Sequence, residues 1–270
     1  ALIRSSRIAK YIDRAAEFGL SANASQADFP AVMRRVKDVI GAIEPHDSVE
    51  RYTKLGVDCV AGSARITSPW TVEVDGRTIN ARSIVIATGG RPAVPPIPGL
   101  DDVGYLTSDT LWELDELPER LLVMGGGAIG CEWAQAFCRL GAHVTRVEMQ
   151  DRLLAIEDTE ITAHVERSFS NDGIELLLNT KVTKFELDNG KRIALCATAA
   201  GSPTRVEFDY VLVAAGRRGN TEGLGHENLG IETNRNGTVP VNDYLQTQFP
   251  NGYACGEVAV PSAMHQADAH

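Results

Sequence analysis

The residues of this chain that are best suited to chemistry are three glycines and one acid. Gly125, Gly127 and Gly130 have the spacing G-x-G-x-x-G and directly follow the apolar run 121–124. In this spacing the first glycine permits a tight turn, the second lets the backbone approach a pyrophosphate, and the third lets a helix pack closely against a strand. The acid, Glu148, follows about 20 residues later and can accept hydrogen bonds from ribose hydroxyls. These residues predict a site for a dinucleotide.

The elements expected around these residues have the order that such a site requires. The strand 121–124 enters the turn, a helix is expected from about Ala128 to Leu140, and Gly141 is suited to end it in a left-handed conformation. A second apolar strand then ends at Glu148. The N-terminus of the helix would face the phosphate charge. A purely structural glycine turn is the alternative, but the order strand, turn, helix, strand and acid favours a βαβ dinucleotide site.

Composition and charge narrow the class of protein. The 270 residues suffice for about two domains. A formal net charge of −10 argues against nucleic acid or an anionic membrane as the main partner. No apolar run approaches the roughly 18 residues of a membrane span. The five cysteines include no C-x-x-C or C-x-x-x-x-C pair, which favours reduced thiols in the cytoplasm over a disulfide scaffold or a zinc site.

The remaining patterns predict an α/β protein, in which antiparallel hairpins are added to a doubly wound core. Helical patterns cover 1–18 and, with Asp28 as N-cap, about 29–43. The proline-rich stretch 91–99 cannot continue a strand or a helix and indicates a domain boundary. The other expected elements are hairpins at 70–81 and 182–197, strands at 83–87, 174–178 and 208–214, and helices at 109–114 and 158–169.

Four segments of the sequence together resemble one known family. They are Ile84–Gly99 (IVIATGGRPAVPPIPG), Val123–Glu132 (VMGGGAIGCE), Val213–Asn220 (VAAGRRGN) and Tyr253–Val258 (YACGEV). In type, order and spacing they look like the successive motifs of the pyridine nucleotide-disulfide oxidoreductases, the family of dihydrolipoamide dehydrogenase and mercuric reductase. The resemblance extends over nearly the whole chain and is therefore far more specific than any single motif.

This resemblance implies a Rossmann-like three-layer NAD domain inserted in a partial FAD-binding domain. The implied division is a first FAD-domain segment at 1–106, the NAD(P)-binding domain at 107–217 and an FAD-domain return segment at 218–270. Family members also carry an FAD glycine motif, a C-x-x-x-x-C redox pair and a C-terminal dimerisation domain, which are not found in these residues. The sequence is therefore expected to be a fragment of a longer, homodimeric flavoprotein.

The resemblance also implies roles for residues in the NAD domain. Glu132 resembles the family acid that pairs with a lysine beside the flavin, and it is the catalytic candidate. Ala128 stands where some relatives have a tyrosine lid, so an ungated nicotinamide pocket is expected. The residues expected to hold NAD are Gly125, Gly126, Gly127, Ala128, Ile129, Gly130 and Glu148, with the backbone at Val182 and Gly216 near the adenine and nicotinamide ends.

A second set of residues is expected to contact FAD. Glu257 replaces the usual aspartate whose carboxylate holds the ribityl chain, and is one methylene longer. Backbone contacts to the adenine half and the pyrophosphate are expected at Ala64, Thr88, Gly89 and Gly90. The segment expected beside the flavin ring comprises Ala263, Met264, His265 and Gln266.

By this resemblance the intact protein would pass a hydride from NADH to FAD, and electrons onward to a disulfide or a metal. No metal site and no nucleic-acid partner are expected. Two alternatives stay open: a flavin NADH oxidase or transhydrogenase that never uses a disulfide, and a non-catalytic NAD-binding module. A cysteine pair upstream would distinguish the disulfide oxidoreductase from the NADH oxidase or transhydrogenase. Bleaching of bound flavin by NADH would distinguish both kinds of enzyme from the non-catalytic NAD-binding module.

Overall fold

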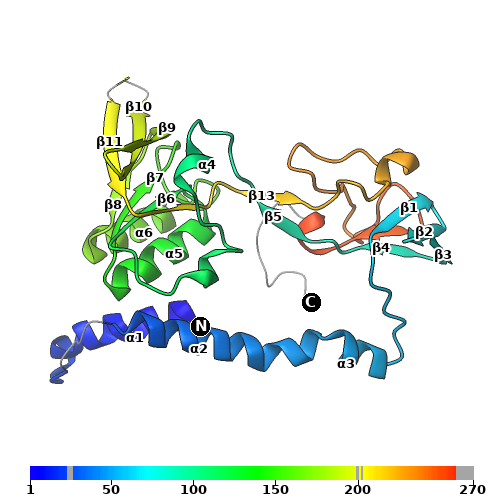
Figure 1. The fold of residues 1–270 in the computed structure, drawn as a ribbon, viewed down its shortest axis with the longest axis horizontal. Coiled ribbons are helices and arrows are strands. Elements are labelled where there is room, and N and C mark those ends of the chain that lie inside the picture. Colours follow the sequence, from blue (N-terminus) through cyan, green and yellow to red (C-terminus); the bar gives the residue numbers. More distant parts are fainter. Residues whose placement is uncertain (23–26, 199–200, 202, 260–270) are drawn as a thin grey trace. The chain divides into compact units, whose positions relative to one another are not determined.

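The computed structural model describes residues 1–22, 27–198, 201 and 203–259 (Figure 1). The chain divides into two units. Unit 1 comprises Ala1–Glu44 and Pro92–Gly216, and unit 2 comprises Pro45–Arg91 and Arg217–His270. The chain passes from unit 2 to unit 1 between Arg91 and Pro92, inside the proline-rich stretch 91–99. The first 44 residues group with unit 1, although the sequence-based division joins them to the FAD-binding segment; that division stays a prediction.

A four-stranded parallel sheet forms the centre of unit 1. Its order is β12 (Tyr210–Val213), β6 (Arg120–Met124), β7 (His143–Val147) and β8 (Glu175–Leu177). β6 has buried side chains on both faces, because Leu121 and Val123 belong to one hydrophobic core and Leu122 and Met124 to another. This double burial explains the uninterrupted apolar run before the glycine turn.

Helices cover one face of this sheet. α5 (Ala128–Leu140) and α6 (Thr159–Asp172) lie along it (Figure 1), and each ends at a left-handed glycine, Gly141 and Gly173, as predicted. The buried residues Ala134, Phe137 and Phe169 on these helices share a core with Leu121 of β6. The predicted strand, turn and helix are confirmed in this part of the chain.

Two N-terminal helices add a further layer outside α5. They are α1 (Leu2–Asp13) and α2 (Phe29–Ile43), and α2 is capped by the side chain of Asp28 as predicted. Leu2, Phe29 and Met33 are almost fully buried in the same core as α5. Burial of their apolar faces against α5 is what holds this pair of helices in unit 1.

An antiparallel sheet covers the other face of the parallel sheet. It comprises β9 (Thr180–Asp188), β10 (Lys191–Thr198) and β11 (Pro203–Phe208), in the order β11-β10-β9. The predicted turn between β9 and β10 is confirmed, since Asn189 and Gly190 have φ of +52° and +81°. The short helix α4 (Leu100–Val103) packs on β9. α5 and α6, the parallel sheet and the antiparallel sheet therefore form three α/β layers, and α1 and α2 pack outside them.

A buried acid ties three of these helices together. The Asp172 carboxylate, at the end of α6, accepts hydrogen bonds at 2.8 Å from Gln135 and Arg139 of α5 and forms a 2.8 Å ion pair with Lys10 of α1. Its side chain is only 3% exposed. Burial alone would raise the pKa of Asp172, but the hydrogen bonds from Lys10 and Gln135 and the charge of Arg139 outweigh it and hold the pKa below its usual range.

Replacing this acid, Asp172→Asn, is expected to lower the free energy of unfolding by about 1–3 kcal/mol at pH 7. Because the folded-state pKa is depressed, the charged form contributes stability above the ordinary carboxyl pKa, and that contribution is lost as the pH falls through the folded value. Urea unfolding of the unchanged protein and of Asp172→Asn should therefore show a difference in the free energy of unfolding at pH 7. This difference should disappear only at acidic pH. Asp38→Asn, which changes an exposed acid on α2, is the control. A difference in unfolding free energy that stays the same in acid would contradict a stabilising role for the ionised Asp172 carboxylate.

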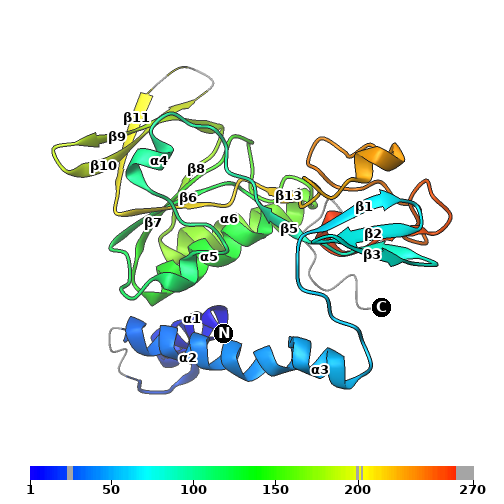
Figure 2. The same cartoon turned by 45° about the vertical axis from the view of Figure 1, so that its right-hand side comes forward.

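The regular elements of unit 2 are mainly short strands, joined by long irregular segments (Figure 2). Its three-stranded antiparallel sheet is β1 (Ala64–Ser68), β2 (Thr71–Val74) and β3 (Arg77–Asn80), with the predicted tight turn at Asp75-Gly76. Two strand pairs complete it: β4 (Ile84–Ile86) parallel to β14 (Gly252–Ala254), and β5 (Gly90–Pro92) with β13 (Arg217–Gly219). The short helix α3 (Val49–Lys54) begins at a Ser48 cap.

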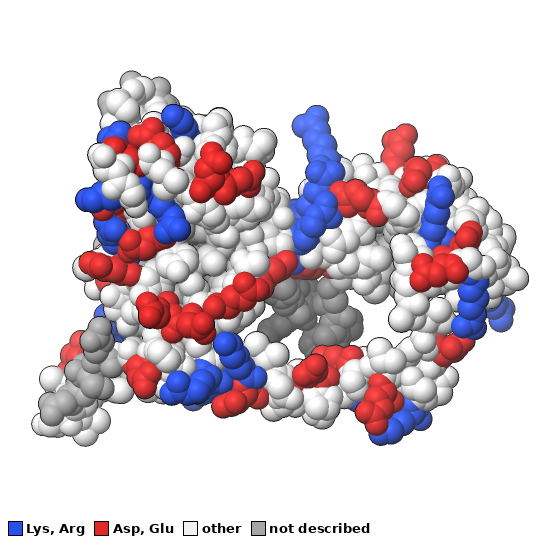
Figure 3. Space-filling view, in the orientation of Figure 1, with Lys and Arg blue, Asp and Glu red and all other residues white. Residues whose placement is uncertain are grey.

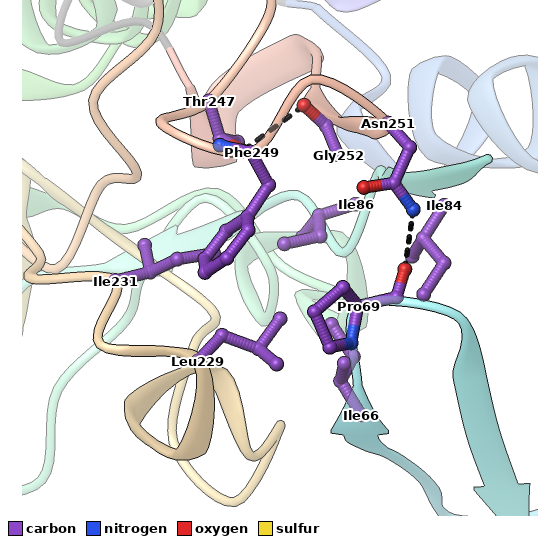
Figure 4. A pocket seen from close by; sticks show the side chains of 10 residues that line it. All are labelled: Ile66, Pro69, Ile84, Ile86, Leu229, Ile231, Thr247, Phe249, Asn251 and Gly252. Atoms are coloured by element: carbon purple, nitrogen blue, oxygen red, sulfur yellow. Dashed lines mark hydrogen bonds between the residues drawn. The ribbon is translucent and has the colours of Figure 1, made fainter.

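The apolar side chains of unit 2 leave a small pocket between β1, β4 and the segment before β14 (Figure 4). Asn251 closes one side by donating a hydrogen bond to the carbonyl of Pro69. The lining residues are Ile66, Pro69, Ile84, Ile86, Leu229, Ile231, Thr247, Phe249, Asn251 and Gly252. This lining contains no ionisable side chain and no cysteine.

Three predicted elements differ from the structure. The first helix ends at Asp13 and is followed by a separate turn of 3-10 helix, Ala15–Phe18. The strand predicted at 208–214 is interrupted at Asp209, whose carboxylate accepts hydrogen bonds from the backbone and side chain of Arg120. The helix predicted at 109–114 is a single 3-10 turn, Leu111–Glu113. Side-chain hydrogen bonds and local turns of this kind break elements that apolar patterns alone would continue.

Candidate dinucleotide-binding site

Two of the three motif glycines are required by the fold itself. Gly125 has φ of +110°, and a Cβ added there would lie 2.2 Å from the carbonyl oxygen of Ala214. A Cβ on Gly130 would lie 2.9 Å from the carbonyl oxygen of Gly125 and 3.3 Å from the Cβ of Ala214. The first glycine therefore makes the turn, and the third lets α5 approach the strands, as the spacing predicts.

Gly127 is different, because nothing in the described part of the chain requires it to be glycine. Its φ of −74° and ψ of 173° are favourable for any residue. A Cβ added there meets no atom within 4 Å, and the residue is exposed. The turn thus leaves open the space that a side chain would fill. This opening fits a pyrophosphate that approaches the backbone at the second glycine.

The start of α5 provides hydrogen-bond donors at the same place. The helical hydrogen-bond ladder begins with Cys131, whose N–H donates to the carbonyl of Gly127 at 3.0 Å. The amides of Ala128, Ile129 and Gly130 precede it in the first turn, where backbone N–H groups have no partner within the helix. These donors and the helix dipole make the N-terminus of α5 suited to an anion.

The predicted acid lies directly beside the turn. Glu148 follows β7, and its carboxylate Oε1 accepts a hydrogen bond from the N–H of Gln150 at 2.7 Å. A Cβ added to Gly126 would be 2.5 Å from Oε2 of Glu148, so the carboxylate covers the middle of the glycine motif. The structure therefore brings together the glycines and the acid that the sequence singled out.

A second charged residue of this region is buried. Arg146, on β7, is 0% exposed and donates hydrogen bonds to the carbonyl of Gly125 from Nε (2.9 Å) and Nη2 (2.6 Å). Its Nη2 also donates to the carbonyl of Gly127 at 3.0 Å. Sequence reasoning did not place it behind the turn, although the alternation of β7 offers a signal. Val144 packs toward the helices, and a residue two positions later points to the same face.

The two backbone positions proposed for the ends of NAD lie in different surroundings. Val182 is buried in β9, which begins beside the acid, since the N–H of Thr180 donates to the carbonyl of Glu148 at 2.9 Å. Gly216 is exposed, with φ of +129°, and its carbonyl accepts a hydrogen bond from Ala93 at 2.9 Å. Glu132 is exposed on α5 just after its first turn, and the described residues give it no salt bridge.

The residues proposed for FAD are found in unit 2. Thr88 donates a 2.6 Å hydrogen bond from Oγ1 to the carbonyl of Asn220, and the N–H of Asn220 donates to the carbonyl of Gly89 at 3.0 Å. Gly90 is near Glu257, because a Cβ on Gly90 would lie 3.1 Å from Oε2 of that acid. These interactions collect Thr88, Gly89, Gly90 and Glu257 in one region.

The Glu257 carboxylate has a protein partner. It forms a 2.7 Å ion pair with Arg217, which also donates to the carbonyl of Gly90 at 2.9 Å. A contact from Glu257 to a ribityl chain would have to share or exchange this partner. Ala64 begins β1, opposite Val74. The segment Ala263–Gln266 lies outside the described residues.

Comparison with known proteins decides the family. Residues 7–270 match the family model described as pyridine nucleotide-disulphide oxidoreductase. The chain belongs to this family. It is 36% identical over 242 residues to a mercuric reductase of Staphylococcus aureus, covering 90% of this chain and 44% of the relative. It is 33% identical over 264 residues to a dihydrolipoyl dehydrogenase of Chlamydia pneumoniae, covering 96% of this chain and 55% of the relative.

Solved structures of the pyridine nucleotide-disulphide oxidoreductases agree with this assignment. The HOCl-induced flavoprotein disulfide reductase RclA from Escherichia coli superposes with a TM-score of 0.75 at 28% identity, covering 93% of this chain and 55% of that one. The predicted family and the predicted α/β fold class are confirmed. The chain spans about half the length of the curated relatives that it matches.

The surface of this family member carries both signs of charge. On the face drawn in Figure 3, Lys and Arg side chains are interspersed with Asp and Glu. Among the described residues, no helix combines the length and apolar character needed to cross a membrane.

Proposed function

We propose that this chain is the NADH-binding part of an FAD-dependent oxidoreductase. The observation that carries the proposal is the open space at Gly127, between the amides of α5 and the carboxylate of Glu148. Glycine is needed at the first and third motif positions for packing. At the second it is needed only if something outside the protein fills that space. A pyrophosphate has the charge and size that these donors suit.

Each part of the turn has a task in this proposal. The amides at the start of α5 bind the pyrophosphate, and Glu148 accepts hydrogen bonds from the adenosine ribose. Gly216 keeps side-chain atoms away from the nicotinamide end. Ala128 has no side chain that could close over the nicotinamide, so the pocket stays ungated. Glu132, exposed on α5 just after its first turn, is available to pair with a lysine beside the flavin.

In the intact protein, the two cofactors supply hydride transfer from NADH to FAD and onward transfer of electrons to a disulfide or a metal acceptor. The protein's own residues orient them. The turn Thr88–Gly90, held by Asn220, would support the FAD pyrophosphate, with Glu257 near the ribityl chain. We further propose a cytoplasmic homodimer, as the reduced thiols and the family suggest.

Two measurements test this function. Calorimetric titration of the 270-residue chain with NADH is expected to show saturable binding of one NADH per chain. In the intact protein, anaerobic addition of NADH is expected to bleach the flavin absorbance. Binding of NADH without bleaching would favour a non-catalytic NAD-binding module. Absence of NADH binding would contradict the proposal altogether.

A further inference from the structure

The backbone of the glycine turn is held from behind by one side chain, Arg146. Its guanidinium donates three hydrogen bonds, two to the carbonyl of Gly125 and one to the carbonyl of Gly127. It also approaches the helix start, since a Cβ on Gly130 would lie 2.9 Å from Nη2. These contacts fix both peptide groups that flank the exposed part of the turn.

Fixing these two carbonyls also fixes two amides. In a trans peptide the C=O and the N–H of the same group point in opposite directions. The N–H groups of Gly126 and Ala128, which share peptide groups with the Gly125 and Gly127 carbonyls, therefore point away from Arg146. A carbonyl that turned outward instead would present a negative dipole to an incoming phosphate. Arg146 thus prevents the turn from adopting an orientation that repels an anion.

The charge of Arg146 lacks a carboxylate partner within the described part of the chain. Its Cζ lies 5.7 Å from the ring centroid of Phe169, and Nη1 is buried without a hydrogen-bond partner among those residues. Glu148 interacts with it electrostatically but forms no salt bridge there. The neighbouring Cys131 gives no counter-charge at neutral pH, because burial raises the pKa of its thiol in spite of the attraction of Arg146 for a thiolate.

A buried cation of this kind is costly unless an anion compensates it. Burial accordingly lowers the pKa of Arg146 from its usual value, although an arginine stays protonated in proteins. The peptide groups that it holds are those that face the proposed pyrophosphate. A dinucleotide bound at the turn would therefore bring two negative charges to the far side of the same peptide groups.

We propose that Arg146 is a positioning residue for the dinucleotide pyrophosphate. It holds the turn with its amides outward, and its charge is compensated when the pyrophosphate binds. This inference rests on the proposed NADH site and adds a determinant that lies beneath the glycine motif rather than within it. Arg146 should therefore increase the affinity for ligands that contain the pyrophosphate, but not the affinity for the nucleoside alone.

The test compares Arg146→Met and Arg146→Lys with the unchanged chain, using ADP-ribose and adenosine as probes. ADP-ribose contains the pyrophosphate, whereas adenosine engages only the ribose and adenine side. Arg146→Met is expected to raise the Kd for ADP-ribose roughly tenfold or more. The Kd for adenosine, followed by NMR titration, should change less than about twofold. Arg146→Lys keeps the charge but lacks the planar guanidinium that donates from two nitrogens. Its Kd for ADP-ribose should therefore lie between those of the unchanged chain and of Arg146→Met.

Controls separate this effect from general loosening of the fold. Arg205→Met removes the same charge from an exposed site in unit 1, where Arg205 pairs with Glu186 and Asp188, and should leave both affinities unchanged. Equal weakening of adenosine and ADP-ribose in Arg146→Met would show a merely structural role and overturn the inference. So would unchanged binding of ADP-ribose.

If Arg146→Met does not fold by circular dichroism, the same comparison is made with Arg146→Lys. A larger loss for ADP-ribose than for adenosine supports the inference, and equal losses overturn it. Failure of the proposed function is recognised separately, because the unchanged chain would then bind neither ADP-ribose nor NADH.

Discussion

Gly127→Val is expected to weaken NADH binding by a factor of roughly 100 or more, while the protein stays folded. The valine Cβ enters space that no atom of the described residues occupies, at φ and ψ values that valine readily adopts. The loss of glycine as helix cap costs at most about 1 kcal/mol of stability. The same side chain stands where the pyrophosphate would approach, so the charged hydrogen bonds at the helix start are lost.

The matched control is the same substitution two residues earlier. Gly125→Val forces a left-handed residue to carry a branched side chain, whose Cβ would lie 2.2 Å from the carbonyl of Ala214. It is therefore expected to destabilise unit 1 itself, by several kcal/mol. Calorimetric titration with NADH and thermal unfolding of both variants distinguish the two roles. A folded Gly127→Val variant with unchanged NADH affinity would show that the motif is only a structural turn.

NADH is expected to bind about 10- to 100-fold more tightly than NADPH. The additional 2′-phosphate would meet the Glu148 carboxylate, which lies over Gly126, and would disrupt the hydrogen bonds to the ribose. Arg146 and Arg152 are cations near Glu148 in the sequence that could offset this repulsion. Arg146 is excluded because it is buried and bound to the turn carbonyls, and Arg152 donates hydrogen bonds to Thr159 and to the carbonyl of Ala155.

Titration of the chain with each nucleotide measures this preference, and Glu148→Gln supplies the control. Without the carboxylate charge, the repulsion of the 2′-phosphate should diminish and the ratio of the two affinities should fall toward one. Tighter binding of NADPH than of NADH by the unchanged chain would refute the role of Glu148.

The parts of the fold that could be predicted from the sequence are those fixed locally. The turn Asn189-Gly190 needs residues that adopt positive φ, and both residues do so in the structure. The helix end at Gly141 likewise depends on one residue's backbone freedom. The glycines and Glu148 could be brought together from spacing alone, because a βαβ unit places consecutive strand ends side by side.

The remaining features depend on partners that are distant in sequence. An amphipathic pattern shows that α1 has an apolar face but not that α5 covers it, so the grouping of α1 and α2 with unit 1 was not foreseen. The burial of Arg146 could not be predicted either, since a charged side chain is expected at the surface unless a buried acceptor is known. Here its acceptors are the carbonyls of Gly125 and Gly127, which become available only when the turn folds over β7.

The most direct test of the account is an NMR titration of the isotope-labelled chain with ADP-ribose, followed at every backbone amide. We predict that the largest shifts occur at Gly126, Ala128 and the first turn of α5, with smaller shifts beside Glu148. The amides of unit 2 should shift little. Largest shifts outside residues 125–148, or saturation without any shift at the start of α5, would contradict the claim that this turn binds the dinucleotide.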